Sequence, residues 1–430
     1  MPAVNLRVVP HASVGPVPAE SVRKTEILEA AANVFGTSGL RSSLQEVADA
    51  SGILPGSLYH HFASKEDIFV ELVQRYQADL DQIADAAMDQ NRAAAAPPLD
   101  QVVALGTAIA QCAIRHRAAL LLTFYEPPAG SSDQLVRLAR RTPTAITSAM
   151  FATLQAARSA GALRPSVDPA ILADRLCQSM LHVGIGVYHL TRGAEQRPAL
   201  ECRMFLRGLA VRSPDDARLN RSHASRAADE QIKSWNEEDR GGADGKAATV
   251  RAVARSEFAR RGYELTTIRD VAASAGLSTG TVYRLVDSKA DLLASIMQSY
   301  AEKVTQGWAR IVNSRSTPVE KLDALLWFNI NVMERFGEES RIQMAGLQQY
   351  PPKSRDLPMT FPTQLRHLKT LLREGRDTKT LQIDGDSLDM GARCLFALVW
   401  TPENIVRDVG ARRALRAARD SVLRGAATRS

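Results

Sequence analysis

An internal repeat constrains the fold of this chain more than any other feature of its 430 residues. The segment at 35–67 reads FGTSGLRSSLQEVADASGILPGSLYHHFASKED, and the segment at 258–291 reads FARRGYELTTIRDVAASAGLSTGTVYRLVDSKAD. Phe35 and Gly39 align with Phe258 and Gly262 at an offset of 223 residues. At an offset of 224, eight residues recur: Val47, Ala48, Gly52, Gly56, Tyr59, Ser64, Lys65 and Asp67 match Val271, Ala272, Gly276, Gly280, Tyr283, Ser288, Lys289 and Asp291. Two copies are too few for a solenoid, so the repeat indicates a duplicated domain.

The composition is that of an ordinary globular protein, with 45% hydrophobic and 23% charged residues. No apolar run approaches the roughly 18–20 residues that cross a bilayer, so no membrane association is expected. The proline-containing segment at 1–20 is typical of a disordered tail rather than of a signal peptide. The four cysteines lie far apart and no pair has metal-ligand spacing, which favours reduced thiols in a cytoplasmic protein.

Each copy has the pattern of a helix, a second short helix, a tight turn and a third short helix. In copy one, an amphipathic helix over 21–38 ends at Gly39, and Ser43 and Glu46 form a capping box for a helix over 43–50. Gly52 lies in the turn before a third helix over 54–61, and copy two repeats the scheme. The arrangement is a helix-turn-helix, whose second helix enters the major groove of DNA.

Small and polar residues of these helices are suited to contact with a duplex. Glycine allows close approach of the backbone, and hydroxyl, imidazole and guanidinium groups can meet base edges or phosphates. A lysine in the first turn of the following helix would hold a phosphate together with the backbone amides. The candidate DNA-contacting residues are Ser43, Gly56, Ser57, Tyr59, His60 and Lys65 in copy one, and Thr267, Thr279, Gly280, Thr281, Tyr283, Arg284 and Lys289 in copy two.

At these residues the chain resembles the TetR family of bacterial regulators. The run YHHFASK at 59–65 and the run GTVY at 280–283 are similar to the family's most diagnostic stretch, and the resemblance covers about fifty residues of each copy. It implies an all-α fold of two TetR-like repeats, each with a three-helix head and a body of about six helices. It also implies a ligand cavity in the body and dimerisation through the last helices. Copy two has RLV at 284–286 where copy one has HHF at 60–62, so the two heads are expected to prefer different bases.

The repeat and the composition between its copies predict the domain boundaries. They are a tail at 1–20, a first head at 21–76, a first body at 77–212, a linker at 213–245, a second head at 246–300 and a second body at 301–430. The linker is interpreted as a plain tether, with a short helix over Ala224–Trp235 as the alternative. Body one is expected to contain a single helix over Asp133–Ala160. We expect the bodies to pack as an intramolecular pseudo-dimer in a monomeric chain, and a homodimer of chains is the alternative.

Aromatic and methionine side chains at helical spacing are candidates for lining a ligand cavity, although the same pattern is typical of a core. They are His116, Phe124, Phe151 and Met180 in body one, and Trp327, Phe336, Met344 and Trp400 in body two. We expect a small apolar effector. The run ILPGSLYHH of head one is similar to that of family members that respond to acyl-CoA-like thioesters.

The two heads differ in charge within a chain whose net charge is +7. Residues 21–76 contain 5 Lys/Arg against 7 Asp/Glu, whereas residues 246–300 contain 8 against 5. Because phosphate neutralisation supplies most non-specific affinity, the second head is expected to hold DNA more tightly. A scaffold regulator in which only the second head binds DNA is therefore an open alternative.

Enzyme motifs are missing from the sequence: there is no nucleotide-binding glycine loop, no GxSxG elbow and no His/Asp/Glu cluster at metal spacing. We therefore expect no catalytic residue, no metal and no cofactor. The sequence predicts a ligand-responsive transcriptional regulator, a repressor in the commoner behaviour of the family it resembles. Its partner would be a double-stranded DNA operator, released when the effector binds.

Overall fold

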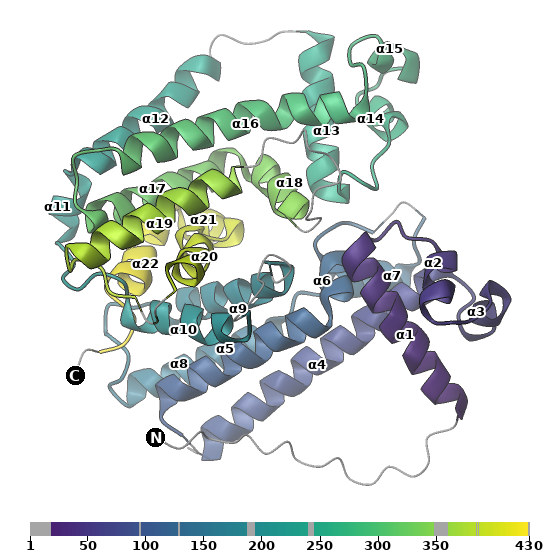
Figure 1. Ribbon diagram of the computed structural model, residues 1–430, viewed down its shortest axis with the longest axis horizontal. Helices are drawn as coiled ribbons and strands as arrows, with labels where there is room; N and C mark the ends of the chain where they lie inside the picture. The colour runs from purple at the N-terminus through teal and green to yellow at the C-terminus, as the bar shows by residue number, and fades with distance from the viewer. Residues whose placement is uncertain are drawn as a thin grey trace.

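The computed structural model describes residues 19–93, 96–127, 130–186, 194–239, 245–347, 360–383, 385 and 387–428. Within these ranges the regular structure is helical apart from two isolated antiparallel bridges, which confirms the all-α fold (Figure 1). Most of the predicted tail lies outside the described residues, and its last two residues begin the first helix. Among the described helices, none combines the length and apolarity needed to span a bilayer.

The first repeat forms one head and one body. The head consists of α1 (Ala19–Ser38), α2 (Leu44–Ala50) and α3 (Pro55–His61). The helices of the body are α4 (Lys65–Ala93), α5 (Pro98–Arg115), α6 (Arg117–Thr123), α7 (Asp133–Arg140), α8 (Thr144–Ser159), α9 (Pro169–Gly186) and α10 (Arg197–Arg207). The prediction of a single helix over Asp133–Ala160 is wrong. Pro143 cannot donate a backbone hydrogen bond and disfavours helical backbone at the preceding residue, so the helix breaks into α7 and α8.

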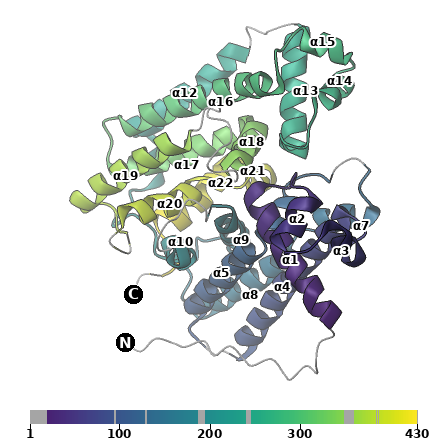
Figure 2. The same cartoon turned by 45° about the vertical axis from the view of Figure 1, so that its right-hand side comes forward.

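The second repeat has the same head and a similar body. Its head consists of α13 (Lys246–Arg261), α14 (Ile268–Ser274) and α15 (Thr279–Tyr283). The body contains α16 (Lys289–Val312), α17 (Pro318–Arg335), α18 (Gly337–Leu347), α19 (Phe361–Asp377), α20 (Leu388–Val399), α21 (Glu403–Val409), α22 (Ala411–Ala418) and a π-helical turn, η3 (Arg419–Leu423). In both views of the molecule the two heads lie at the same end of their bodies (Figures 1 and 2).

Between the repeats, the described residues 213–239 are folded, so the prediction of a plain tether is wrong for this part of 213–245. It contains α11 (Asp216–Asn220) and α12 (His223–Asp239), and α12 packs along α16 and α17. Trp235 is buried and meets Phe328 and Phe336 edge to face, with ring centroids 5.4 and 5.1 Å apart. Ala224 and Ala228 are fully buried on the same side of the helix, a stripe at helical spacing that the charged residues around it obscured. The helical alternative therefore holds, over a longer span than predicted.

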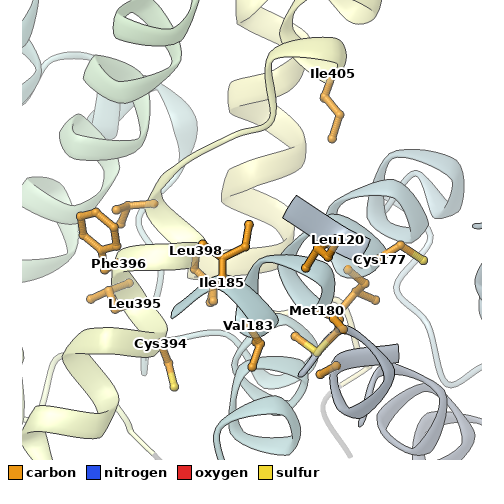
Figure 3. Close-up of a cluster of buried hydrophobic side chains, with 14 of the residues drawn as sticks. Leu120, Cys177, Met180, Val183, Ile185, Cys394, Leu395, Phe396, Leu398 and Ile405 are labelled. Carbon is orange, nitrogen blue, oxygen red and sulfur yellow. The ribbon is translucent and has the colours of Figure 1, made fainter. Parts of the chain in front are cut away.

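The two bodies pack against each other as an intramolecular pseudo-dimer, through α9 and α10 of the first and α20 and η3 of the second. Apolar side chains from both repeats meet there, among them Val183 and Ile185 from α9 and Leu395 and Leu398 from α20 (Figure 3). The buried guanidinium of Arg175 crosses the seam and donates to the Leu398 carbonyl at 2.9 Å and to the Ser421 hydroxyl at 3.3 Å. Because apolar side chains of both repeats are buried together in this seam, the two repeats form one folded unit.

Two backbone segments cross at the seam with two-fold pseudo-symmetry. Leu209 N donates to the Val422 carbonyl and Ala426 N to the Phe205 carbonyl, at 2.9 and 3.0 Å. The crossing residues Gly208 and Gly425 have φ of 72° and 80°, and a Cβ on Gly208 would lie 2.2 Å from the Gly425 nitrogen. Only glycine fits either position. The surrounding sequences, FLRGLAVRS at 205–213 and VLRGAATRS at 422–430, are a second part of the repeat that the sequence analysis missed.

Candidate nucleic-acid interface

Both heads are built around the same buried contacts. In head one, Phe35 of α1, Val47 of α2 and Leu58 of α3 have no exposed surface. Phe258, Val271 and Val282 take the equivalent buried places in head two. The turns between the last two helices contain Gly52 and Gly276, whose φ values of +63° and +65° favour glycine. These contacts hold α3 and α15 against the rest of the head with their opposite faces in solvent.

The outward faces carry the predicted tyrosines. Tyr59 is 55% exposed and Tyr283 is 56% exposed, a large exposure for an aromatic side chain, and it is the same in both repeats. Ser57 and His60 of head one and Arg284 of head two are also exposed, whereas Thr279 and Thr281 are half-buried. A ring with a hydroxyl at its tip, standing out from a short helix, can pack on a sugar and donate to a phosphate.

Gly56 and Gly280 lie on the same outward faces. Neither has a positive φ, and a Cβ built on either would have no neighbouring atom within 4 Å. Glycine within a helix costs about 1 kcal/mol relative to alanine, so the fold alone gives no reason for glycine here. Close approach of another molecule to the backbone does give one, at equivalent positions of both heads.

The capping residues of the first short helices hold their own helix ends. The Ser43 hydroxyl accepts from Glu46 N at 3.2 Å while Ser43 N donates to the Glu46 carboxylate at 2.6 Å. Thr267 and Asp270 form the same pair in head two. Both predicted capping boxes are thus present, and Ser43 and Thr267 remain exposed at the start of α2 and α14.

The predicted phosphate role of Lys65 and Lys289 is not supported by the orientation of their side chains. Lys65 Nζ turns inward and donates to the Leu40 carbonyl at 2.6 Å. Lys289 Nζ donates to the carbonyls of Tyr263 and Thr266 at 2.8 and 2.9 Å and lies 4.1 Å from the Tyr263 ring centroid. Burial lowers the pKa of both ammonium groups. Each lysine fastens the long helix after the head to the loop before the helix-turn-helix, because the unpaired carbonyls of that loop need a donor.

The two outward faces differ in how their side chains are held. In head two, Ser278 caps α15, and its hydroxyl lies 2.9 Å from that of Thr281, to which Arg284 also donates at 3.1 Å. In head one, the position before α3 is Leu54, which is 77% exposed and makes no side-chain cap. Within the described structure, the side chains of Ser57 and His60 make no hydrogen bond. Head two therefore presents a linked polar face, and head one a more apolar and unlinked one.

A cavity of about 550 Å³ opens in body one. Its apolar wall includes Tyr76, Leu80, Leu120, Phe124 and Leu181. Of the predicted pocket residues in body one, only Phe124 lines it. His116 instead lies 2.8 Å from Asp79, Phe151 faces solvent on α8, and Met180 is fully buried beside Cys202. Periodicity could identify their helices but not which side of each helix faces the cavity.

The predicted pocket residues of body two do not line this cavity, because they pack among α12, α17, α18 and α20. Trp327 Nε1 donates to Asp229 on α12 at 2.8 Å. Phe336 packs against Trp235, and Trp400 lies near Phe396 with ring centroids 6.4 Å apart. Met344 is half-buried on α18. Among the lining residues that the sequence analysis missed are Arg140 and Arg141, whose signal was the RRTP run before α8.

The chain is similar to known regulators at both heads. A sequence-family model, that of bacterial regulatory proteins of the tetR family, matches residues 27–72 and 250–296. The HTH-type transcriptional repressor KstR2 of Rhodococcus jostii is 48% identical over 62 residues, covering 14% of this chain and 30% of that protein. KstR2 of Mycolicibacterium smegmatis is 35% identical over 120 residues, covering 26% of this chain and 52% of that protein. The matched part thus spans between about a third and a half of these relatives.

A solved structure, that of the ketosteroid transcriptional regulator KstR2 of Mycobacterium tuberculosis, aligns with 21% identity and a TM-score of 0.39. The alignment covers 44% of this chain and 98% of that one. The family match is more telling, because its two segments fall on the two helix-turn-helix heads. The family model of bacterial regulatory proteins, tetR family, therefore matches each helix-turn-helix head, once in each repeat.

Proposed function

We propose that the protein is a DNA-binding transcriptional regulator that contacts double-stranded DNA through α3 and α15. The observation that carries this proposal is the shared outward face of these helices. Each presents an exposed tyrosine and, three residues earlier, a glycine with open space before it. A helix of this kind lies in the major groove in helix-turn-helix proteins, where hydroxyl and guanidinium groups meet bases and phosphates.

The two heads would recognise unlike half-sites. Head one presents Ser57, Tyr59 and His60, whereas head two presents Tyr283 and Arg284 beside the linked hydroxyls of Ser278 and Thr281. An arginine favours guanine, and a histidine does not form the same paired contact. Because both heads belong to one chain, the site would be non-palindromic, with half-sites about one DNA turn (roughly 34 Å) apart.

Repression released by a small apolar effector is the regulation we propose. The curated relatives are named transcriptional repressors, and body one contains a cavity of a size that suits a small molecule. An acyl-CoA-like thioester, whose acyl chain is apolar, is one such effector. A ligand that binds better to one arrangement of the heads would shift the population toward it and change operator affinity.

Selection of bound DNA from a random library by the full chain tests the proposal. The expected result is a bipartite site with unlike halves, bound by one chain, with the stoichiometry given by light scattering of the complex. A palindromic site bound by two chains would replace the pseudo-dimer with a homodimer carrying four heads. Absence of any enriched sequence would overturn the proposal.

A second candidate function is a scaffold regulator in which only head two binds DNA. The acidic balance of head one, with 5 Lys/Arg against 7 Asp/Glu over 21–76, favours it because like charge repels the phosphate backbone. Under this alternative the selected site would be a single half-site. Protection of a single half-site in a footprint would then distinguish it from two working heads.

A further inference from the structure

The cavity of body one is closed on one side by the other repeat. Three of its lining residues belong to copy two: Ala259 and Arg260 of α13 and Arg341 of α18. The rest of the wall comes from α4, α6, α7, α9, the segment after α6 and the connection between α7 and α8. A molecule in this cavity would therefore touch body one and the head of the second repeat together.

The contact between the segment after α6 and α13 is direct. Glu126 N donates to the Arg260 carbonyl at 3.0 Å, and the two side chains form an ion pair. The Tyr125 ring lies so close to Gly262 that a Cβ there would be 3.2 Å from it. Phe124, Tyr125 and Glu126 also line the cavity, so one short segment is both the cavity wall and the support of head two. In both views the end of α13 lies beside this part of body one (Figures 1 and 2).

The charges around the cavity indicate the kind of ligand. Four arginines and two carboxylates lie on its wall: Arg140, Arg141, Arg260 and Arg341, with Asp81 and Glu126. Arg141 pairs with Asp81, Arg260 with Glu126 and Arg341 with Glu403. Arg140 has no ion-pair partner in the described structure. Burial lowers the pKa of His182 to about 4, so this histidine is neutral and the positive charge comes from the arginines. An apolar molecule that carries an anionic group fits such a wall.

We propose that this cavity binds an apolar anion and that its occupancy repositions head two through the segment 124–126. This inference rests on the proposed function for its biological meaning, but the binding and the movement can be measured without DNA. The effector would thus act across the repeat boundary, from body one to the head of copy two. The distance between head two and body one is the quantity that changes.

Binding is tested with two dyes of similar ring structure, the anionic 8-anilinonaphthalene-1-sulfonate and the uncharged N-phenyl-1-naphthylamine, on the full chain. The sulfonate dye is expected to bind one site per chain at least about 10-fold more tightly than the uncharged dye. Arg140→Gln should remove most of that difference, and Leu181→Trp, which fills the cavity, should abolish saturable binding. Arg137→Gln is the matched control, because Arg137 lies on α7 but not on the cavity wall. Equal affinity of the two dyes, or no effect of Arg140→Gln and Leu181→Trp, would overturn the site.

Movement is tested with spin labels on Asp85→Cys in α4 and Asp287→Cys beside α15, both exposed. The native cysteines are buried, and burial raises the pKa of each thiol, which protects them from labelling. Saturating sulfonate dye should change the distance between the labels in the wild-type background and change it less in Glu126→Gln. An unchanged distance at full occupancy would overturn the coupling. A changed distance with unchanged DNA affinity would instead count against the proposed function.

Discussion

The two heads share the residues that shape them and differ in the residues that face outward. Buried Phe35, Val47 and Leu58 have direct counterparts in copy two, and so does the inward-turned Lys65. The exposed positions diverge. His60 aligns with Arg284, and Leu54, which provides no side-chain cap for α3, aligns with Ser278, which caps α15. Burial constrains a residue through packing whatever the DNA, whereas an exposed position is constrained only by what it touches. The two copies have therefore kept the same buried core in each head and have diverged in the surface that faces outward.

The two heads also differ in their net charge. Head one has an excess of acidic residues and head two an excess of basic residues. If both heads bind DNA, head two should supply most of the non-specific affinity, and head one should contribute mainly through its outward side chains. Four predictions test this division.

The largest expected effect is on operator affinity. Tyr283→Ala with Arg284→Ala should weaken binding of the selected operator about 100-fold, because each lost base or phosphate contact removes about 1–3 kcal/mol. Tyr59→Ala with His60→Ala should weaken it about 10-fold, since the head carries less positive charge. Fluorescence anisotropy with labelled operator measures both. Equal losses would show that the two heads contribute equally to operator affinity, and no loss from Tyr59→Ala with His60→Ala would favour the scaffold alternative.

Gly56→Ala and Gly280→Ala should separate binding from stability. Either change should raise the free energy of unfolding by up to about 1 kcal/mol, because alanine favours helix and has open space around it. Operator affinity should nevertheless fall about 10-fold if the duplex approaches this backbone. Urea denaturation and anisotropy on the same samples provide the two measurements. A variant that gained stability and kept full affinity would show that DNA does not approach that helix closely.

The inward lysines should affect stability rather than DNA contact. Lys289→Met should lower the free energy of unfolding by about 1 kcal/mol, and Lys65→Met by less, because the first donates two hydrogen bonds to carbonyls and the second donates one. Hydrogen exchange at the start of α16 and α4 would show which head loosens. If either variant lost the salt dependence of operator binding and kept its stability, the result would show that the replaced lysine contacts a DNA phosphate.

The smallest expected effect concerns the helix caps. Ser278→Ala should destabilise α15 by about 0.5–1 kcal/mol, because the hydroxyl that accepts from Thr281 N is removed. Leu54→Ser should stabilise α3 by a few tenths of a kcal/mol by supplying such a cap. Amide exchange rates in the two helices report both changes. Opposite signs in the two heads would confirm that the cap is a real difference between them.

The two bodies differ as the heads do. At the offset of 224 residues Tyr76 corresponds to Tyr300. Tyr76 lines the cavity of body one, whereas the buried Tyr300 packs beside Phe336, which in turn meets Trp235 of α12. The helix between the repeats thus contributes aromatic bulk to the interior of body two. This contrast makes body one the better place for an effector.

The sequence alone determined the heads: the repeated Phe, Val, Gly and Tyr positions and the two capping boxes are local patterns, and the forces behind them act within a few residues. Its periodicity also indicated two helical bodies, and the resemblance to the TetR family implied their packing as a pseudo-dimer. Tertiary structure decided the rest. Lys65 turns toward a carbonyl 25 residues away, and Glu126 meets Arg260 across 134 residues. Trp235 is buried because α16 and α17 cover it. Whether a charge faces solvent or a carbonyl, and whether an apolar residue lines a cavity or fills a core, depends on partners that no local spacing identifies.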